Sequence, residues 1–143
     1  MKIPFKRLSD KAILPTYATP ASAGADLYAA ETVSIRPRET VLVHTGVALA
    51  IPEGYGGFIY ARSGLASKRG LAPANKVGVI DADYRGEIMV ALYNQSDKEE
   101  TVEAGERIAQ LVIAPVYRAD FEETEELDGT LRGDGGFGST GKK

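Results

Sequence analysis

Two aspartates in the stretch VIDADYRG, residues 79–86, are the first side chains in this sequence that could do chemistry. Asp81 and Asp83 are two residues apart, so on a regular strand they would share one face. Such a pair could bind a metal ion, or one carboxylate could act as a general base while the other supports it. The same residues could instead satisfy the backbone of a turn beside Tyr84, so the stretch alone leaves two interpretations open.

A second candidate site lies in ARSGLAS, residues 61–67. Arg62 and Ser63 stand where a predicted strand meets a predicted helix, and the N–H groups at the start of a helix attract anions. A helix cap beside a surface arginine would explain the same two residues. Asp26, in AGADLYAA at residues 23–30, is expected in a turn lined by alanine and glycine, and the stretch assigns it no role.

The final stretch, RGDGGFGSTGKK at residues 132–143, could surround a polyphosphate. Half of residues 132–141 are glycine, so backbone N–H groups are accessible, and Arg132, Ser139 and Thr140 add a cation and two hydroxyls. Glycine loses much conformational entropy on ordering, which favours a segment that orders around a ligand. A frayed terminus is the other interpretation.

The same stretch resembles a phosphate-binding P-loop only in part. GFGSTGK, residues 136–142, approaches the P-loop pattern, but Lys143 stands where a serine or threonine should bind Mg²⁺. The helix that must follow a P-loop is also missing, because the sequence stops at that lysine. We therefore expect a glycine-rich arm that contacts phosphates and offers Phe137 as a ring for stacking.

The elements that must position these residues read mainly as short strands. Residues 40–54 alternate through Val41, Val43 and Thr45, as a half-buried strand does. Apolar runs on both sides of DADYRG predict a hairpin at that point. The runs on both sides of the turn at residues 104–106 predict a second hairpin.

A single short helix is predicted at SGLASKRG, with Ser63 as its N-cap and Gly70 as its stop. The frequent turns predict an all-β fold, a jelly-roll-like β-barrel or sandwich. The domain plan that we expect is a β-barrel core at residues 1–118, an acidic connector at 119–131 and a flexible arm at 132–143.

The composition is that of an ordinary globular protein and excludes several kinds of site. The 143 residues are 43% hydrophobic and 26% charged, which suits one domain with a sizeable core. Cysteine is absent and there is one histidine, which excludes thiolate chemistry, a His-rich zinc site and an obvious Ser-His triad. The net charge of −3 argues against nucleic acid as the main partner. Without a signal peptide or membrane span, we expect a cytoplasmic protein with no membrane partner.

Five stretches in order resemble the motifs of the trimeric dUTPase family, the deoxyuridine triphosphate nucleotidohydrolases. These stretches are AGADLYAA, ARSGLAS, VGVIDADYRGEI, GERIAQLVI and RGDGGFGSTG, and they span residues 23–141. The resemblance implies an enzyme that hydrolyses dUTP to dUMP and pyrophosphate with Mg²⁺. It also implies a homotrimer with shared active sites, in which the C-terminal arm closes over a nucleotide bound at a neighbouring subunit.

The resemblance implies a role for each matching residue. Asp81 would orient and deprotonate the attacking water, and Tyr84 would lie under the deoxyribose and exclude a 2′-hydroxyl. We expect Asp83 to be structural. Asp26 would reach Mg²⁺ through a water molecule. The remaining implied contacts are Asn75 and the backbone of Val79, Ile80 and Met89 for uracil; Arg62, Ser63, Gly64 and Gln110 for the α- and β-phosphates; and, in the arm, Arg132, Gly138, Ser139 and Thr140 around the γ-phosphate, with Phe137 over the base.

Three other functions fit parts of the same pattern. A nucleotide-sensing or partner-binding module would keep the pocket without turnover. A dCTP-deaminase-like enzyme would release ammonia, although the absence of cysteine excludes the zinc-dependent kind. A broader nucleoside triphosphate pyrophosphatase would accept dTTP or UTP as readily as dUTP.

Overall fold

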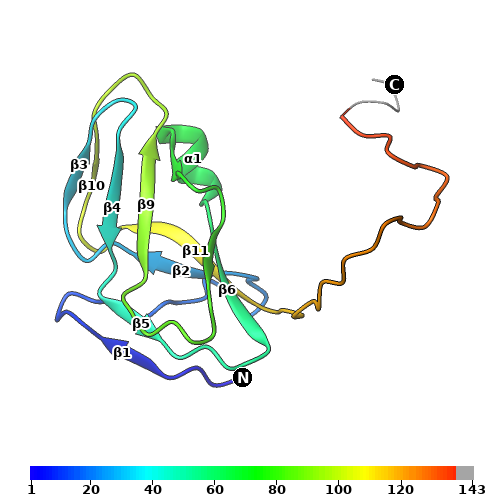
Figure 1. Cartoon of the computed structure of the whole chain (residues 1–143). Helices are drawn as coiled ribbons and strands as arrows, with labels where there is room; N and C mark the ends of the chain where they lie inside the picture. Colours follow the sequence, from blue (N-terminus) through cyan, green and yellow to red (C-terminus); the bar gives the residue numbers. More distant parts are fainter. Residues whose placement is uncertain (138–143) are drawn as a thin grey trace.

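The computed structural model describes residues 1–137, which form short strands and one helix (Figure 1). This confirms the predicted all-β class with a single short helix. The strands and the helix are β1 (Phe5–Arg7), β2 (Ala25–Tyr28), β3 (Val33–Ile35), β4 (Thr40–His44), β5 (Val47–Leu49), β6 (Tyr55–Tyr60), α1 (Ser63–Arg69), β7 (Leu71–Pro73), β8 (Gly78–Ile80), β9 (Met89–Asn94), β10 (Glu100–Val102) and β11 (Arg107–Pro115).

Two larger sheets enclose the hydrophobic core. One has the strand order β2-β11-β6-β8 and the other the order β4-β9-β7, while β1-β5 and β10-β3 form two-stranded sheets. Buried side chains from both larger sheets meet in one cluster that includes Leu27, Leu111, Val43 and Leu92. The sheets stay open within residues 1–137, so the architecture is that of a sandwich and the barrel alternative is wrong.

Strand β4 shows why the local pattern predicts strands well. Val43 is buried and Val41 half-buried, whereas Leu42 and His44 between and after them are exposed. This alternation is what a sheet with one face on the core requires. The strand pairs with β9 along its whole length.

Both predicted hairpins are wrong. β8 pairs with β6, whereas β9 pairs with β4 and β7 in the other large sheet. In the same way β10 pairs with β3, and β11 pairs with β2 and β6. The turn residues at 81–88 therefore carry the chain from one sheet to the other, and Asp81 and Asp83 lie in this crossover and not on a strand face.

The helix confirms the predicted stop and corrects the predicted start. Gly70 ends α1 with φ of 68°, and its N–H bonds back to the last turn, which is the usual left-handed glycine cap. Arg62, not Ser63, is the N-cap, and its side chain makes no capping hydrogen bond because it reaches elsewhere. The last turn is held by Arg69, which pairs with Glu100 and Glu106.

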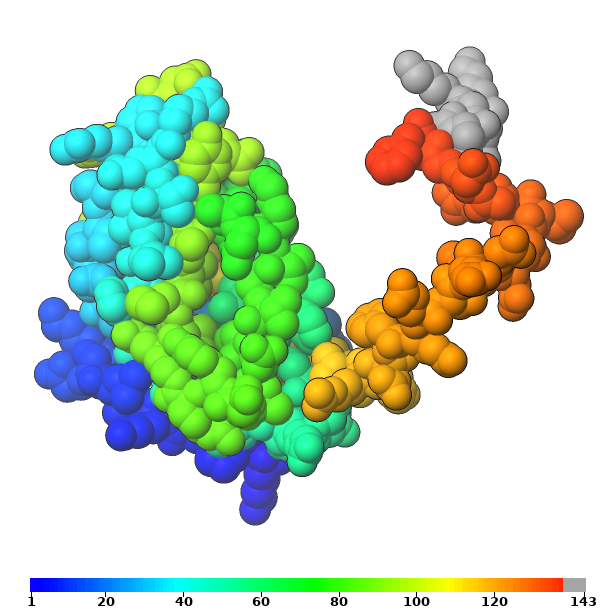
Figure 2. Space-filling view, in the orientation of Figure 1, coloured from blue at the N-terminus to red at the C-terminus, as the bar shows by residue number. Residues whose placement is uncertain are grey.

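The C-terminal segment leaves the sheets after β11. Residues 117–134 are all exposed, and the segment extends away from the body of the molecule (Figures 1 and 2). In the described part of the chain, no helix has the length and apolar character needed to cross a membrane.

Candidate active site

A cavity of about 270 Å³ lies where the two large sheets part, between β8 and the start of β9. Strand β8 is the outer strand of its sheet, so one side of its backbone faces the cavity without a strand partner in residues 1–137. On the opposite wall, β7 pairs with β9 only as far as Leu92, and the Ala74 N–H then donates to the Ala91 carbonyl at 2.8 Å. Backbone groups alternate in direction along a strand, so Met89 turns its N–H and C=O to the same side as Ala91, where β7 has ended.

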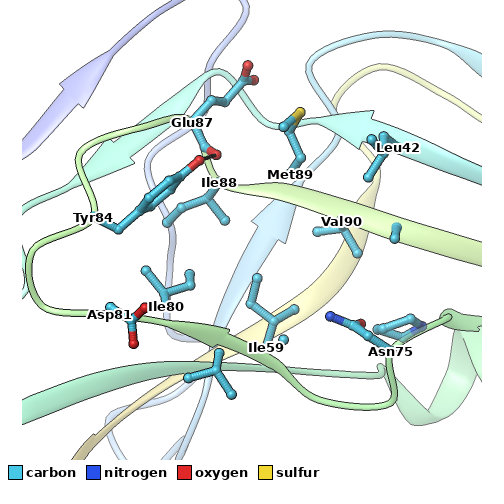
Figure 3. A pocket seen from close by; sticks show the side chains of 14 residues that line it. Leu42, Ile59, Asn75, Ile80, Asp81, Tyr84, Glu87, Ile88, Met89 and Val90 are labelled. Atoms are coloured by element: carbon cyan, nitrogen blue, oxygen red, sulfur yellow. Dashed lines mark hydrogen bonds between the residues drawn. The ribbon is translucent and has the colours of Figure 1, made fainter.

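The cavity therefore takes the place of a missing strand, and we call it the strand gap. Backbone donors and acceptors border it on both sides, so a flat polar ring could pair with both edges. Asn75 and Asp81 lie at opposite ends of β8 along the gap (Figure 3). The floor is apolar, with Ile59, Ile80 and Val90 beneath.

Six of the residues predicted for a site line the strand gap together. They come from the turn before β8, from β8, from the crossover and from β9, and they are Asn75, Val79, Ile80, Asp81, Tyr84 and Met89. The sequence analysis missed Gly78, which also lines the gap. A Cβ atom at this glycine would lie 3.3 Å from Ile59 Cβ and 3.4 Å from Asn75 Nδ2, so a larger residue would crowd Ile59 in the floor of the gap. Asp83 is exposed and does not line the gap.

The crossover holds Tyr84 and Asp81 at the mouth of the gap. Both side chains are exposed, and the Asp81 carboxylate has no ion-pair partner among residues 1–137. The Tyr84 ring folds back over Gly86, and its hydroxyl donates to the Glu87 carbonyl at 2.9 Å (Figure 3). The Asp81 carboxylate is thus available as a base beside a ring that the backbone holds.

A second interaction pins the far end of the crossover. Glu87 accepts from the Gly46 N–H at 2.7 Å, and its other oxygen lies 2.8 Å from Nδ1 of His44. The hydrogen bond and charge of Glu87 raise the pKa of His44 above its ordinary value. Burial would raise the pKa of Glu87, but the bonds from His44 and Gly46 outweigh it and hold that pKa below its ordinary value.

A separate polar cluster surrounds Asp26. Contrary to the expected turn, Asp26 lies on β2 and is buried. Arg62 Nε donates to one carboxylate oxygen at 3.0 Å and Arg107 Nη1 to the other at 3.2 Å. Gln110 on β11 sits between Asp26 and Tyr60 in the strand register. The cluster joins two cations and an amide beside the exposed start of α1.

The start of α1 has no packing reason for its glycine. Ser63 and Gly64 are both exposed, and a Cβ atom at Gly64 would meet nothing within 4 Å. The absence of a side chain at Gly64 leaves open space next to Arg62. Because the N–H groups at the start of a helix attract anions, this space suits the approach of an anion.

The Asp26 cluster and the strand gap lie at opposite edges of one sheet. Asp26 belongs to β2 and the gap lies beyond β8, with β11 and β6 between them. Three strand spacings of about 4.8 Å put these outer strands roughly 14 Å apart. Although Arg62 follows β6, its side chain points toward Asp26 and away from the gap. One chain therefore does not bring all predicted contacts together.

The arm residues lie apart from both groups. Arg132 bonds to the Gly135 carbonyl at 2.7 Å, and Phe137 is fully exposed. Gly138, Ser139 and Thr140 lie outside the described residues. No group of three His, Cys, Asp or Glu side chains that could hold a metal occurs in residues 1–137.

Besides Gly78, three residues of these sites were missed in the sequence analysis. Arg107 stands within the stretch GERIAQLVI, in the same motif as Gln110. Its positive charge in that motif was a signal that could have identified it as a site residue. Glu87 and His44 carry no local signal, because their pairing joins residues 43 positions apart.

Comparison with known proteins places these features in one family. A dUTPase family model matches residues 10–141. The deoxyuridine 5′-triphosphate nucleotidohydrolase of Hydrogenobaculum sp. (strain Y04AAS1) is 54% identical over 144 residues and covers 100% of both chains. The protein of the same name from Syntrophotalea carbinolica is 52% identical, over 97% of this chain and 96% of the relative.

Solved structures of proteins from the same family also match this chain. A mutant dUTPase of Staphylococcus bacteriophage 80alpha with dUpNHpp matches with a TM-score of 0.92 at 33% identity, covering 98% of each chain. A mutant dUTPase from phage phi11 of S. aureus, described as revealing the coordination of a structural Mg(II) ion, matches with a TM-score of 0.81 at 30% identity. That match covers 88% of this chain and 98% of the phage protein.

Proposed function

The chain belongs to the dUTPase family, and from this premise we propose that it hydrolyses dUTP to dUMP and pyrophosphate, with Asp81 as the base. The observation that carries the proposal is the strand gap, in which an available carboxylate, a tyrosine ring and two open backbone edges converge. Asp81 takes a proton from water, which attacks the α-phosphate. The bond from that phosphorus to the bridging oxygen breaks, and pyrophosphate leaves.

The base is read by backbone groups in the gap. Uracil presents one N–H donor between two carbonyl acceptors, so it pairs with strand edges that offer both donors and acceptors. Asn75 adds a side-chain amide at the end of β8 opposite Asp81. The apolar floor and the width of a single strand leave no room for the methyl group of thymine.

The sugar is selected by Tyr84. Its ring stands at the mouth of the gap and is tied to the Glu87 carbonyl, so a 2′-hydroxyl on the substrate would collide with a ring that is held in place. A clash is needed here because an apolar pocket alone rejects an added hydroxyl only about a hundredfold.

The triphosphate is held between copies of the chain. Arg62, Ser63, Gly64 and Gln110 form an anion-binding surface around Asp26, and Asp26 lies on a strand roughly 14 Å of sheet away from the gap of the same chain. We propose a homotrimer in which this surface faces the strand gap of a neighbour. The C-terminal arm, with Arg132, Phe137 and residues 138–140, then reaches a neighbouring site and covers the nucleotide.

The donor set around Asp26 fits a magnesium ion that binds mainly to the substrate. Each oxygen of this carboxylate accepts one arginine hydrogen bond, and a carboxylate offers about four lone-pair sites, so it can still accept from a metal-bound water. Mg²⁺ keeps several waters and takes phosphate oxygens as ligands. When bound it would neutralise charge on the triphosphate. Asp26 would hold it through water.

Pyrophosphate release from dUTP, UTP, dTTP and dCTP with Mg²⁺ tests the reaction and its specificity. We expect release from dUTP alone. Equal release from UTP or dTTP would refute the roles of Tyr84 and the gap, and ammonia from dCTP would indicate a deaminase. Tight dUTP binding without release would indicate a nucleotide sensor.

Mixed oligomers test the shared site. Asp81→Asn chains and chains truncated after Thr130 should each be inactive alone, because one lacks the base and the other the arm. Refolded together, they should recover activity, since some sites combine an intact base from one chain with an arm from another. The control mixes Asp81→Asn chains with chains that carry both changes, where recovery is impossible. No recovery in the first mixture would refute sharing.

A further inference from the structure

The pair formed by His44 and Glu87 lies next to the strand gap but takes no part in the proposed chemistry. Glu87 lines the gap on one side and a surface hollow with His44 on the other. His44 is also the direct cross-strand partner of Met89, whose backbone borders the gap. The pair therefore touches both the end of the crossover and the beginning of β9.

Glu87 is fixed at three points. Its carboxylate oxygens meet the Gly46 N–H at 2.7 Å and His44 Nδ1 at 2.8 Å. Its own carbonyl accepts the Tyr84 hydroxyl at 2.9 Å. The next residue, Ile88, donates its N–H to the Val47 carbonyl at 2.8 Å. The side chain of Glu87 thus anchors the same residue whose backbone holds the tyrosine ring.

We propose that His44 and Glu87 act as positioning residues for Tyr84, so that their hydrogen bond sets how strictly the enzyme excludes a ribonucleotide. This rests on the proposed function, because it deepens the role of Tyr84 in selecting the sugar. Without the anchor, the Glu87 carbonyl and the ring that it holds gain freedom, and the space for a 2′-hydroxyl opens. Neither side chain needs to contact the substrate.

The charged neighbours of the pair make the anchor sensitive to pH. Asp10, Lys11 and Glu31 line the same hollow as His44 and Glu87. Glu87 raises the pKa of His44, with a smaller contribution from Glu31. When His44 loses its proton as the pH rises through this raised pKa, the charge on one side of the hydrogen bond disappears and the anchor weakens.

The first test compares the ratio of kcat/KM for dUTP to that for UTP in matched variants. Glu87→Ala should lower this ratio by about tenfold, an effect of the size expected for one lost charge-assisted hydrogen bond. Glu87→Gln can still accept from Gly46 and donate to a neutral His44, so it should keep the ratio above the pKa of His44 and lower it below that pKa, which reverses the dependence on pH. Glu31→Gln removes a nearby charge without breaking the pair, so it should keep the ratio at low pH and lower only slightly the pH at which the anchor weakens. A folded Glu87→Ala enzyme with an unchanged ratio would overturn the proposal.

A double-mutant cycle tests the route through the tyrosine hydroxyl. Tyr84→Phe keeps the ring and removes the bond to the Glu87 carbonyl. If the anchor acts through that bond, Glu87→Ala should have no further effect on the ratio in the Tyr84→Phe background. Additive effects would show that Glu87 acts by another route and would overturn this part of the proposal.

A readout without turnover separates this inference from the proposed function. His44 is the only histidine of the chain, so its imidazole resonances in a proton NMR titration need no assignment among several. The midpoint should lie above 6.5 in the wild type and fall in Glu87→Ala, and the Tyr84 ring resonances should move with the same midpoint. Tyr84 resonances that do not shift as His44 titrates would refute the coupling even in an active enzyme. If no dUTP is hydrolysed but the signals move together, the proposed function fails and the coupling stands.

Discussion

Replacing Gly86 with alanine would test whether the position of the Tyr84 ring governs selection of the sugar. A Cβ atom built at Gly86 lies 2.4 Å from the Tyr84 hydroxyl oxygen and 2.5 Å from Cζ. Ordinary contact begins at 3.4 Å, so the hydroxyl end of the ring must move by 3.4 − 2.4 = 1.0 Å or more. Such a movement breaks its hydrogen bond to the Glu87 carbonyl.

The cost to the fold should be small and the cost to specificity large. The Tyr84 side chain is 43% exposed, so it can swing outward, and the loss of one hydrogen bond lowers the free energy of unfolding by about 1 kcal/mol. Once the ring has moved, little beyond an apolar pocket opposes the extra hydroxyl of UTP. We therefore expect the ratio of kcat/KM for dUTP to that for UTP to fall by a factor of about ten or more. The ratio that remains should approach about one hundred, which is the discrimination that an apolar pocket provides by itself.

The assay is pyrophosphate release with each nucleotide over a range of concentrations. Tyr84→Ala is the comparator, because it should lower the ratio to a similar level, and combining it with Gly86→Ala should add nothing. Gly129→Ala is the neutral control, since a Cβ atom there meets nothing within 4 Å. A folded Gly86→Ala enzyme that still rejects UTP as the wild type does would show that the ring position does not control selection.

Four further outcomes follow from the same geometry. Asp81→Asn should nearly abolish turnover while calorimetry shows nearly unchanged binding of a non-hydrolysable analogue; normal turnover would remove Asp81 as the base. Truncation after Thr130 should leave the melting temperature unchanged and strongly reduce turnover, whereas an unfolded product would make the arm structural. Gly57→Ala should lower the free energy of unfolding in urea by about 1–3 kcal/mol, because its Cβ atom would lie 2.9 Å from a core side chain; equal stability would contradict that packing. The stabilisation from His44 and Glu87 should be greatest between about pH 4.5 and 6.5, since it is lost as pH falls through the lowered pKa of Glu87 and as it rises through the raised pKa of His44; melting curves of wild type and Glu87→Gln that stay parallel across pH would contradict this.

Local periodicity predicted the strands and the helix well because burial on one face determines which neighbouring residues are apolar and which are polar. The alternation from Val41 to Thr45 and the glycine stop at Gly70 are both visible in a few adjacent letters. Strand pairing leaves no such mark. The turn chemistry at residues 81–86 fits a hairpin and a crossover equally, and only the packing of two sheets decides between them.

The candidate site divides in the same way. Its residues could be named from motifs, but the environment of Asp26 depends on arginines 36 and 81 positions away in the chain. The bulge between Arg107 and Ala109 helps to aim one of them, and no local pattern predicts a bulge. The division of the site into two groups likewise depends on the order of strands in a sheet.

The proposed recognition of the base by strand edges has a consequence for resistance to inhibitors. The Val79 side chain is 65% exposed and points away from the core, so substitutions at this position leave the neighbouring backbone groups in place. An inhibitor that hydrogen-bonds only to the backbone edges of β8 and β9 would depend on no side chain whose replacement could weaken its binding. Escape would then require a change in the course of the main chain, which single substitutions rarely achieve without loss of the fold.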